Sequence, residues 1–227
     1  MKRTCLAVVV SWMLPGAALA APCIPGSLGS YIALGSTGCT VGVARFFDFA
    51  SLPVSGSATP IADTGTFVNP VDTPYNPGLR FDVNTSAVAG SFLQRVIGYS
   101  VDGATVTGNT VALLGSQVAP DGAVTATERK CFGQAFNTGT DICGGSSTAL
   151  VAFDLGFDQS LTETLAFVGV GLLGVVLDIG VDGGTTGAAS LSSATTQFNA
   201  VPEPATVTLL GLGLAAGAAR RRQVRRR

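Results

Sequence analysis

The sequence contains no histidine. Without an imidazole side chain, Ser-His-Asp and Cys-His catalysis and the commonest zinc sites are excluded. The chain also lacks a Gly-x-Ser-x-Gly nucleophile elbow and a phosphate-binding loop. We therefore predict that the protein is not an enzyme and that it has no catalytic, cofactor-binding or metal-binding residues.

Positive charge is scarce in the middle of the chain. Eight of the thirteen basic residues lie at the two ends, as Lys2, Arg3 and six C-terminal arginines. Residues 21–200 keep five basic residues against thirteen acidic ones, which gives this part a net charge of −8. Because an acidic surface repels polyanions, we expect no nucleic-acid partner.

The first twenty residues have the pattern of a secretory signal peptide. Lys2 and Arg3 precede the apolar run from Leu6 to Leu14, and Ala18 and Ala20 place small side chains where a signal peptidase reads them. We predict residues 1–20 to be a signal helix that signal peptidase removes after Ala20. The remaining chain is then exported into an oxidising compartment.

Four cysteines remain after this cleavage, and they allow three pairings. Closure of the shorter loops favours Cys23 with Cys39 and Cys131 with Cys143. Each bond would contribute about 2–4 kcal/mol to stability.

Near the C-terminus, an apolar run at residues 205–219 is followed by a basic run at residues 220–227. Residues 205–219 carry no charge and would span about 22 Å as a helix, which is short for a bilayer core of about 30 Å. Arg220, Arg221 and Arg222 follow directly and can reach outward to the headgroups. We predict a weak transmembrane helix at 205–219 and a stop-transfer basic tail at 220–227, which leaves the C-terminus in the cytoplasm.

The segment before this helix contains two prolines that keep its backbone extended. It reads Val201, Pro202, Glu203, Pro204. This motif, the apolar span and the arginine cluster together resemble the PEP-CTERM sorting signal of Gram-negative bacteria that make exopolysaccharide. The resemblance implies that residues 201–227 are a sorting signal and that an exosortase-type membrane protease recognises residues 201–204. An ordinary tail anchor with a proline-rich linker is the alternative interpretation.

Residues 21–200 predict one all-β domain, an antiparallel β-sandwich of the jelly-roll or immunoglobulin-like kind with about eight to ten strands. Turn-forming pairs such as Asp102-Gly103 and Asp121-Gly122 separate runs rich in Val, Thr, Phe and Leu. The predicted strands are 79–83, 92–101, 105–114, 123–130, 149–155, 161–168 and 172–181.

Five other segments are assigned from weaker patterns. We expect a surface arm at 21–38, the first core strand at 41–49, a strand at 61–68, and a last strand or a linker at 187–199. The apolar run 165–177 is long enough to suggest a membrane span, but its three glycines favour two buried strands that meet at Gly169 or Gly171.

Acidic residues beside turns are the remaining candidates for chemistry. Asp154 with Asp158, or Asp178 with Asp182, could form a pair of acids for sugar hydrolysis. Asp121 and Asp182 could supply oxygen ligands for calcium. Ordinary turn chemistry is the favoured interpretation of all five residues.

The middle of the chain also resembles uncharacterised sandwich domains that precede this sorting signal. The similar segments are 46–49, 76–81, 98–101 and 128–131. We expect a secreted or cell-surface protein with a structural or adhesive role in biofilm or exopolysaccharide. A carbohydrate-binding module or carbohydrate-active enzyme is the alternative, although the exported part keeps three tyrosines and no tryptophan for stacking on sugars.

Overall fold

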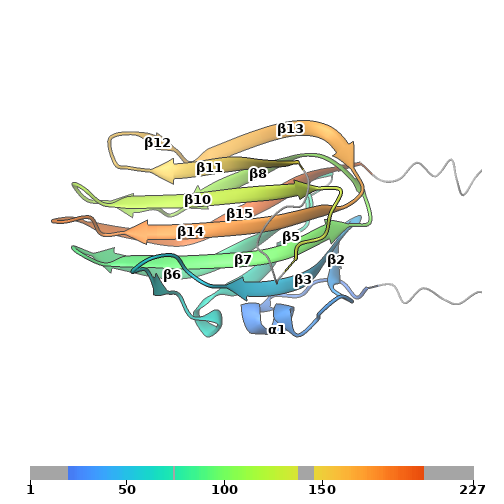
Figure 1. Ribbon diagram of the computed structural model, residues 1–227, viewed down its shortest axis with the longest axis horizontal. Helices are drawn as coiled ribbons and strands as arrows, with labels where there is room; N and C mark the ends of the chain where they lie inside the picture. The colour runs from blue at the N-terminus through green and yellow to red at the C-terminus, as the bar shows by residue number, and fades with distance from the viewer. Residues whose placement is uncertain (1–19, 74, 138–145, 202–227) are drawn as a thin grey trace, which may run out of the picture.

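The computed structural model describes residues 20–73, 75–137 and 146–201. Two β-sheets face each other and enclose one core, as Figure 1 shows. Sheet A has the order β12 (Gln159–Ser160), β11 (Ser147–Asp154), β10 (Ala123–Phe132), β14 (Leu173–Asp182), β7 (Phe92–Asp102), β3 (Ala44–Leu52), β2 (Cys39–Val41). Sheet B has the order β1 (Gly26–Ser27), β5 (Phe67–Val71), β6 (Gly78–Val88), β15 (Ala188–Val201), β8 (Thr105–Leu114), β13 (Thr162–Val170).

Two short strands attach to these sheets. β9 (Gln117–Val118) pairs with β15, and β4 (Thr59–Pro60) lies parallel to β7, whereas the other strand pairs are antiparallel. The predicted antiparallel β-sandwich is therefore confirmed. Ten of the strands in the described residues are five residues or longer. The strands predicted at 92–101, 105–114 and 123–130 correspond to β7, β8 and β10.

The segment expected to be a last strand or a linker is the strand β15, which lies near the middle of sheet B. β15 pairs with β6 on one side and β8 on the other, so the alternative of a linker at 187–199 is wrong. Its Ser, Thr and Ala side chains are small enough to be buried on both faces. Thr196 is one of them, and its hydroxyl lies 2.8 Å from the buried Tyr99 hydroxyl.

The apolar run 165–177 divides into two strands, as predicted, but only one of them is buried. β13 ends at Val170 and β14 begins at Leu173, with Gly171 between them. β13 is an edge strand of sheet B, and its Val168 side chain is 89% exposed. The prediction of two buried strands is therefore wrong for β13, because β13 has a neighbouring strand on one side only, whereas β14 lies between β10 and β7.

Two other predicted strands have different boundaries. The strand expected at 41–49 is a β2–β3 hairpin, because Gly42 adopts φ +55° and turns the chain. The strand expected at 61–68 begins only at Phe67, after a 3-10 turn η1 at Asp63–Gly65.

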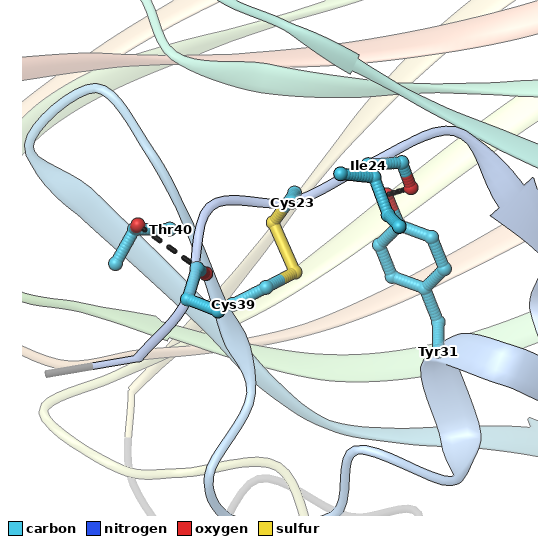
Figure 2. Close-up of a disulfide and its surroundings, with 6 residues drawn as sticks. Cys23, Ile24, Tyr31, Cys39 and Thr40 are labelled. Atoms are coloured by element: carbon cyan, nitrogen blue, oxygen red, sulfur yellow. Dashed lines mark hydrogen bonds between the residues drawn. A yellow bond between two sulfur atoms is a disulfide. The ribbon is translucent and has the colours of Figure 1, made fainter. Parts of the chain in front are cut away.

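The N-terminal arm is more ordered than its composition suggested. It contains a short helix, α1 (Leu28–Ile32). Ser27 caps its N-terminus, because the Ser27 hydroxyl oxygen accepts a hydrogen bond from the Ser30 backbone N–H at 3.3 Å. The Tyr31 hydroxyl donates to the Ile24 carbonyl at 2.9 Å, as Figure 2 shows. The helix was missed because five residues give no helical periodicity to read.

Aromatic side chains fill the centre of the sandwich around Tyr99, which is fully buried. Its ring lies 5.5 Å from that of Phe49 in a stacked arrangement and 6.1 Å from that of Phe81 in sheet B. Burial also raises the pKa of the Tyr99 hydroxyl well above its usual value. The two sheets are therefore held together by a continuous aromatic core.

No helix in the described residues is long and apolar enough to cross a bilayer.

Candidate functional site

The predicted sorting motif begins at Val201, the last residue that the structure describes. Ala200 is buried, and its backbone N–H donates to the Tyr75 carbonyl at 2.8 Å. Val201 still pairs with Thr105, but its side chain is 51% exposed. The last described residue is therefore half exposed, whereas the residue before it is still packed in the sandwich. Other predicted sorting residues lie outside the described residues, namely Pro202, Glu203, Pro204, Arg220, Arg221, Arg222.

The predicted signal-peptidase site lies at the same end of the sandwich. The two ends of the described chain both leave from the right side of Figure 1. The Ala21 carbonyl accepts the Thr40 backbone N–H at 2.9 Å, so the arm is paired to β2 from its first residues. Ala18 and the signal and transmembrane helices fall outside the described residues, and their predictions stay untested.

A disulfide fixes this arm to sheet A. Cys23 and Cys39 are joined with an S–S distance of 2.13 Å, as predicted from loop length (Figure 2). Cys131 is also disulfide-bonded. Its expected partner, Cys143, lies outside the described residues.

The outer face of sheet A carries a polar groove of about 210 Å³. The Gln94 amide nitrogen donates to both carboxylate oxygens of Asp178 at 2.9 Å, and its oxygen accepts from the Ser55 backbone N–H at 2.8 Å. Thr127 and the exposed Arg129 line the groove from β10. The amide and carboxylate groups of the groove are therefore held in place by their own hydrogen bonds.

An aromatic residue closes over the same face beside the groove. Phe136 packs against Leu52, Val96 and Val176, and its ring lies where a side chain at Gly98 would be. The Phe136 backbone N–H donates to the Ser100 hydroxyl at 2.8 Å. The loop after β10 therefore folds back onto the outer face of sheet A.

A second polar cluster lies inside the sandwich, and sequence reasoning did not identify it. Asn109 on β8 and Glu128 and Lys130 on β10 are each fully buried. The Asn109 amide nitrogen donates to Glu128 Oε1 at 2.7 Å, and Lys130 Nζ lies 3.5 Å from the same oxygen. The alternation of residues along β10 could have identified Glu128 and Lys130 as core residues, because they share one face of the strand with Val124 and Ala126.

Burial sets the protonation of this interior cluster. It raises the pKa of Glu128 to about 7, against the opposing positive charge of Lys130. It also lowers the pKa of the Lys130 ammonium, although Glu128 acts in the other direction. Burial therefore disfavours the charged forms of both side chains.

The acids considered for hydrolysis or calcium make bonds typical of turns and strand edges. Asp154 accepts from the Ser116 hydroxyl at 2.7 Å and from the Gly156 backbone N–H at 2.9 Å. Asp182 accepts from the Gly184 backbone N–H at 2.8 Å. Asp121 accepts from the Thr185 hydroxyl, which lowers the pKa of Asp121 to about 2. Within residues 20–73, 75–137 and 146–201, no cluster of three potential metal-ligating side chains occurs.

Comparison with known proteins identifies the C-terminal segment. A family model for the PEP-CTERM protein-sorting motif matches residues 200–223. The chain therefore carries a PEP-CTERM motif at its C-terminus, as its residues predicted. Proteins with this motif are exported and sorted to the cell surface, and the motif implies processing by an exosortase. No curated protein matches the chain.

Solved structures give only distant likenesses to the sandwich. One is TmCBM61 in complex with β-1,4-galactotriose, at 10% identity and a TM-score of 0.27, covering 53% of this chain and 69% of that one. Another is the xylan-binding module CBM86 from Roseburia intestinalis, at 15% identity and a TM-score of 0.24, covering 69% of this chain and 96% of that one. Scores this low add nothing to the assignment of the fold made from the strands.

Proposed function

We propose that this protein is a non-enzymatic component of the cell surface or extracellular matrix, with a structural or adhesive role in biofilm or exopolysaccharide. The observation that carries the proposal is the direct succession of a single packed sandwich and a sorting motif. The central strand β15 ends at Val201, and the matched motif covers residues 200–223. A domain delivered in this way reaches the surface as a preformed unit.

The delivery route follows from the two ends of the chain. Signal peptidase removes residues 1–20, and the segment 205–219 then holds the protein in the inner membrane with its C-terminus in the cytoplasm. An exosortase-type protease cuts near residues 201–204. This cut releases residues 21–200 to the surface or the medium.

A deletion strain tests the structural role. Loss of the gene is expected to reduce biofilm mass and cell aggregation, and the full chain is expected to restore both. A chain with Pro202, Glu203 and Pro204 all replaced by Ala serves as the matched control, because the sandwich is intact and only sorting is affected. Normal biofilm and aggregation in the deletion strain would contradict the proposal.

Glycan binding is a second candidate function, and the polar groove on sheet A favours it. The buried Gln94 amide holds the half-buried Asp178 carboxylate in place at its floor, so Asp178 could accept hydrogen bonds from sugar hydroxyls without reordering. Binding of the host's own polysaccharide, measured by calorimetry, is expected to weaken at least tenfold in Gln94→Ala. Asn69→Ala, an amide on the other sheet, is the control. Formation of sugar products would instead indicate an enzyme.

A further inference from the structure

The interior cluster of Asn109, Glu128 and Lys130 is chemically unusual for the core of a sandwich. All three side chains have no exposed surface. Within the described part of the chain, Asn109 Oδ1 and Glu128 Oε2 have no hydrogen-bond partner. A buried ion pair repays its desolvation only when its remaining polar atoms are satisfied. As a simple ion pair, the cluster would therefore add little to the stability of the fold, and its arrangement calls for another explanation.

The arrangement places an amine and an amide on one carboxylate. Glu128 Oε1 lies 2.7 Å from the Asn109 amide nitrogen and 3.5 Å from Lys130 Nζ. Asn109 belongs to sheet B, whereas Glu128 and Lys130 belong to sheet A. The three groups thus meet across the core, where the surrounding side chains exclude water.

We propose that Lys130 and Asn109 form an intramolecular isopeptide bond, with Glu128 as the catalytic residue that relays the protons. Lys130 Nζ attacks Asn109 Cγ, the Nζ–Cγ bond forms, and the Cγ–Nδ2 bond breaks. Of the three protons on the lysine ammonium, one stays on the new amide nitrogen. The other two pass by way of Glu128 to Nδ2, which leaves as ammonium. No oxidant, metal or cofactor takes part.

The environment of the cluster supplies what this reaction needs. A lysine attacks only as a neutral amine, and burial favours that form of Lys130 while it favours the protonated form of Glu128. When the Asn109 amide rotates about Cβ–Cγ, its oxygen faces Glu128. The protonated carboxyl can then donate to that oxygen and polarise the carbonyl for attack.

The product is a covalent link between the two sheets. It joins β8 of sheet B to β10 of sheet A and removes the charge of Lys130 from the core. Because it rests on the interior cluster alone, this inference is independent of the proposed surface role and of the sorting motif.

Mass spectrometry of the purified, reduced and fully unfolded chain tests the link. The wild-type mass is expected to be lower than the sequence mass by one ammonia molecule. Cleavage before aspartate then separates residues 102–120, which contain Asn109, from residues 121–140, which contain Lys130. These two peptides are expected to run as one branched species. A folded wild-type chain with its full sequence mass would overturn the proposal.

Single substitutions assign the roles within the cluster. Glu128→Gln keeps the shape but cannot relay protons, and it is expected to retain its full sequence mass. Lys130→Met and Asn109→Ala remove the reacting atoms and are also expected to retain the full sequence mass.

Glu163→Gln, which changes a glutamate on the edge strand β13, is the control and is expected to form the link and lose ammonia. Circular dichroism and the Cys23–Cys39 disulfide report whether each variant has folded. A folded Glu128→Gln chain that still loses ammonia would exclude the catalytic role of Glu128.

Discussion

The two faces of strand β10 carry charged residues in opposite surroundings. On the inner face, Glu128 and Lys130 are fully buried beside Asn109. On the outer face, Thr127 and Arg129 line a groove that is open to water. A surface ion pair contributes about 0–1 kcal/mol to stability, whereas removal of one partner of a buried pair costs about 3–5 kcal/mol. The surroundings of a charged residue, rather than its type, therefore decide what its replacement does.

The largest effect is expected for Glu128→Ala on the inner face. The substitution leaves the buried Lys130 and Asn109 side chains without their hydrogen-bonding partner and opens a cavity, so the free energy of unfolding should fall by about 3–5 kcal/mol. Urea denaturation followed by circular dichroism measures this change. A loss below about 1 kcal/mol would show that the interior cluster is no more important than the surface groove.

A somewhat smaller effect is expected for Phe136→Ala on the outer face. Phe136 covers part of this face, and its ring packs against Leu52, Val96 and Val176. Its truncation should lower the free energy of unfolding by about 3 kcal/mol. Phe157→Ala is the control, because the Phe157 side chain is 90% exposed. Equal losses in both variants would refute the claim that the loop after β10 is packed on sheet A.

The pH dependence of stability separates the two faces further. Glu128 has a folded pKa of about 7 against a usual value of 4.5, and the groups that face it are Lys130 and Tyr99. The folded state thus holds a proton that the unfolded state has lost, so stability should decrease by about 1–3 kcal/mol as the pH rises from about 4.5 to 7. Thermal melts across this range measure it. The decrease should be absent in Glu128→Gln, and its persistence there would assign it to another group.

The smallest effect is expected for Arg129→Ala. The side chain is exposed, so its replacement should change the free energy of unfolding by less than about 1 kcal/mol. Urea denaturation alongside Glu128→Ala gives the direct comparison of neighbouring residues on opposite faces. A loss as large as that of Glu128→Ala would remove the distinction between the faces.

The sequence predicted those strands whose ends carry strong turn signals. Asp102-Gly103 separates β7 from β8, and Asp121-Gly122 precedes β10, so these strands were placed to within two residues. The position of β15 was not predictable, because its Ser, Thr and Ala residues show no alternation and its neighbours β6 and β8 lie far away in the chain.

The candidate sites likewise divide into those that the sequence could predict and those that only the fold brings together. The sorting motif was readable because its residues are contiguous, and the Cys23–Cys39 bond was readable because it closes a short loop. Alternation along β10 could have shown that Glu128 and Lys130 face the core. Asn109 could not have been added to them, since it comes from the other sheet and only the packing of the sandwich brings it to Glu128.

The intact mass of the protein from the culture medium and from the membrane fraction, with and without the exosortase-type protease, tests the central claim most directly. In the presence of the protease, the account predicts a released chain that begins at Ala21 and ends near Val201. Without the protease, the chain should stay in the membrane with its C-terminus intact. An unprocessed C-terminus in the membrane even when the protease is present would contradict the account and make this a tail-anchored protein.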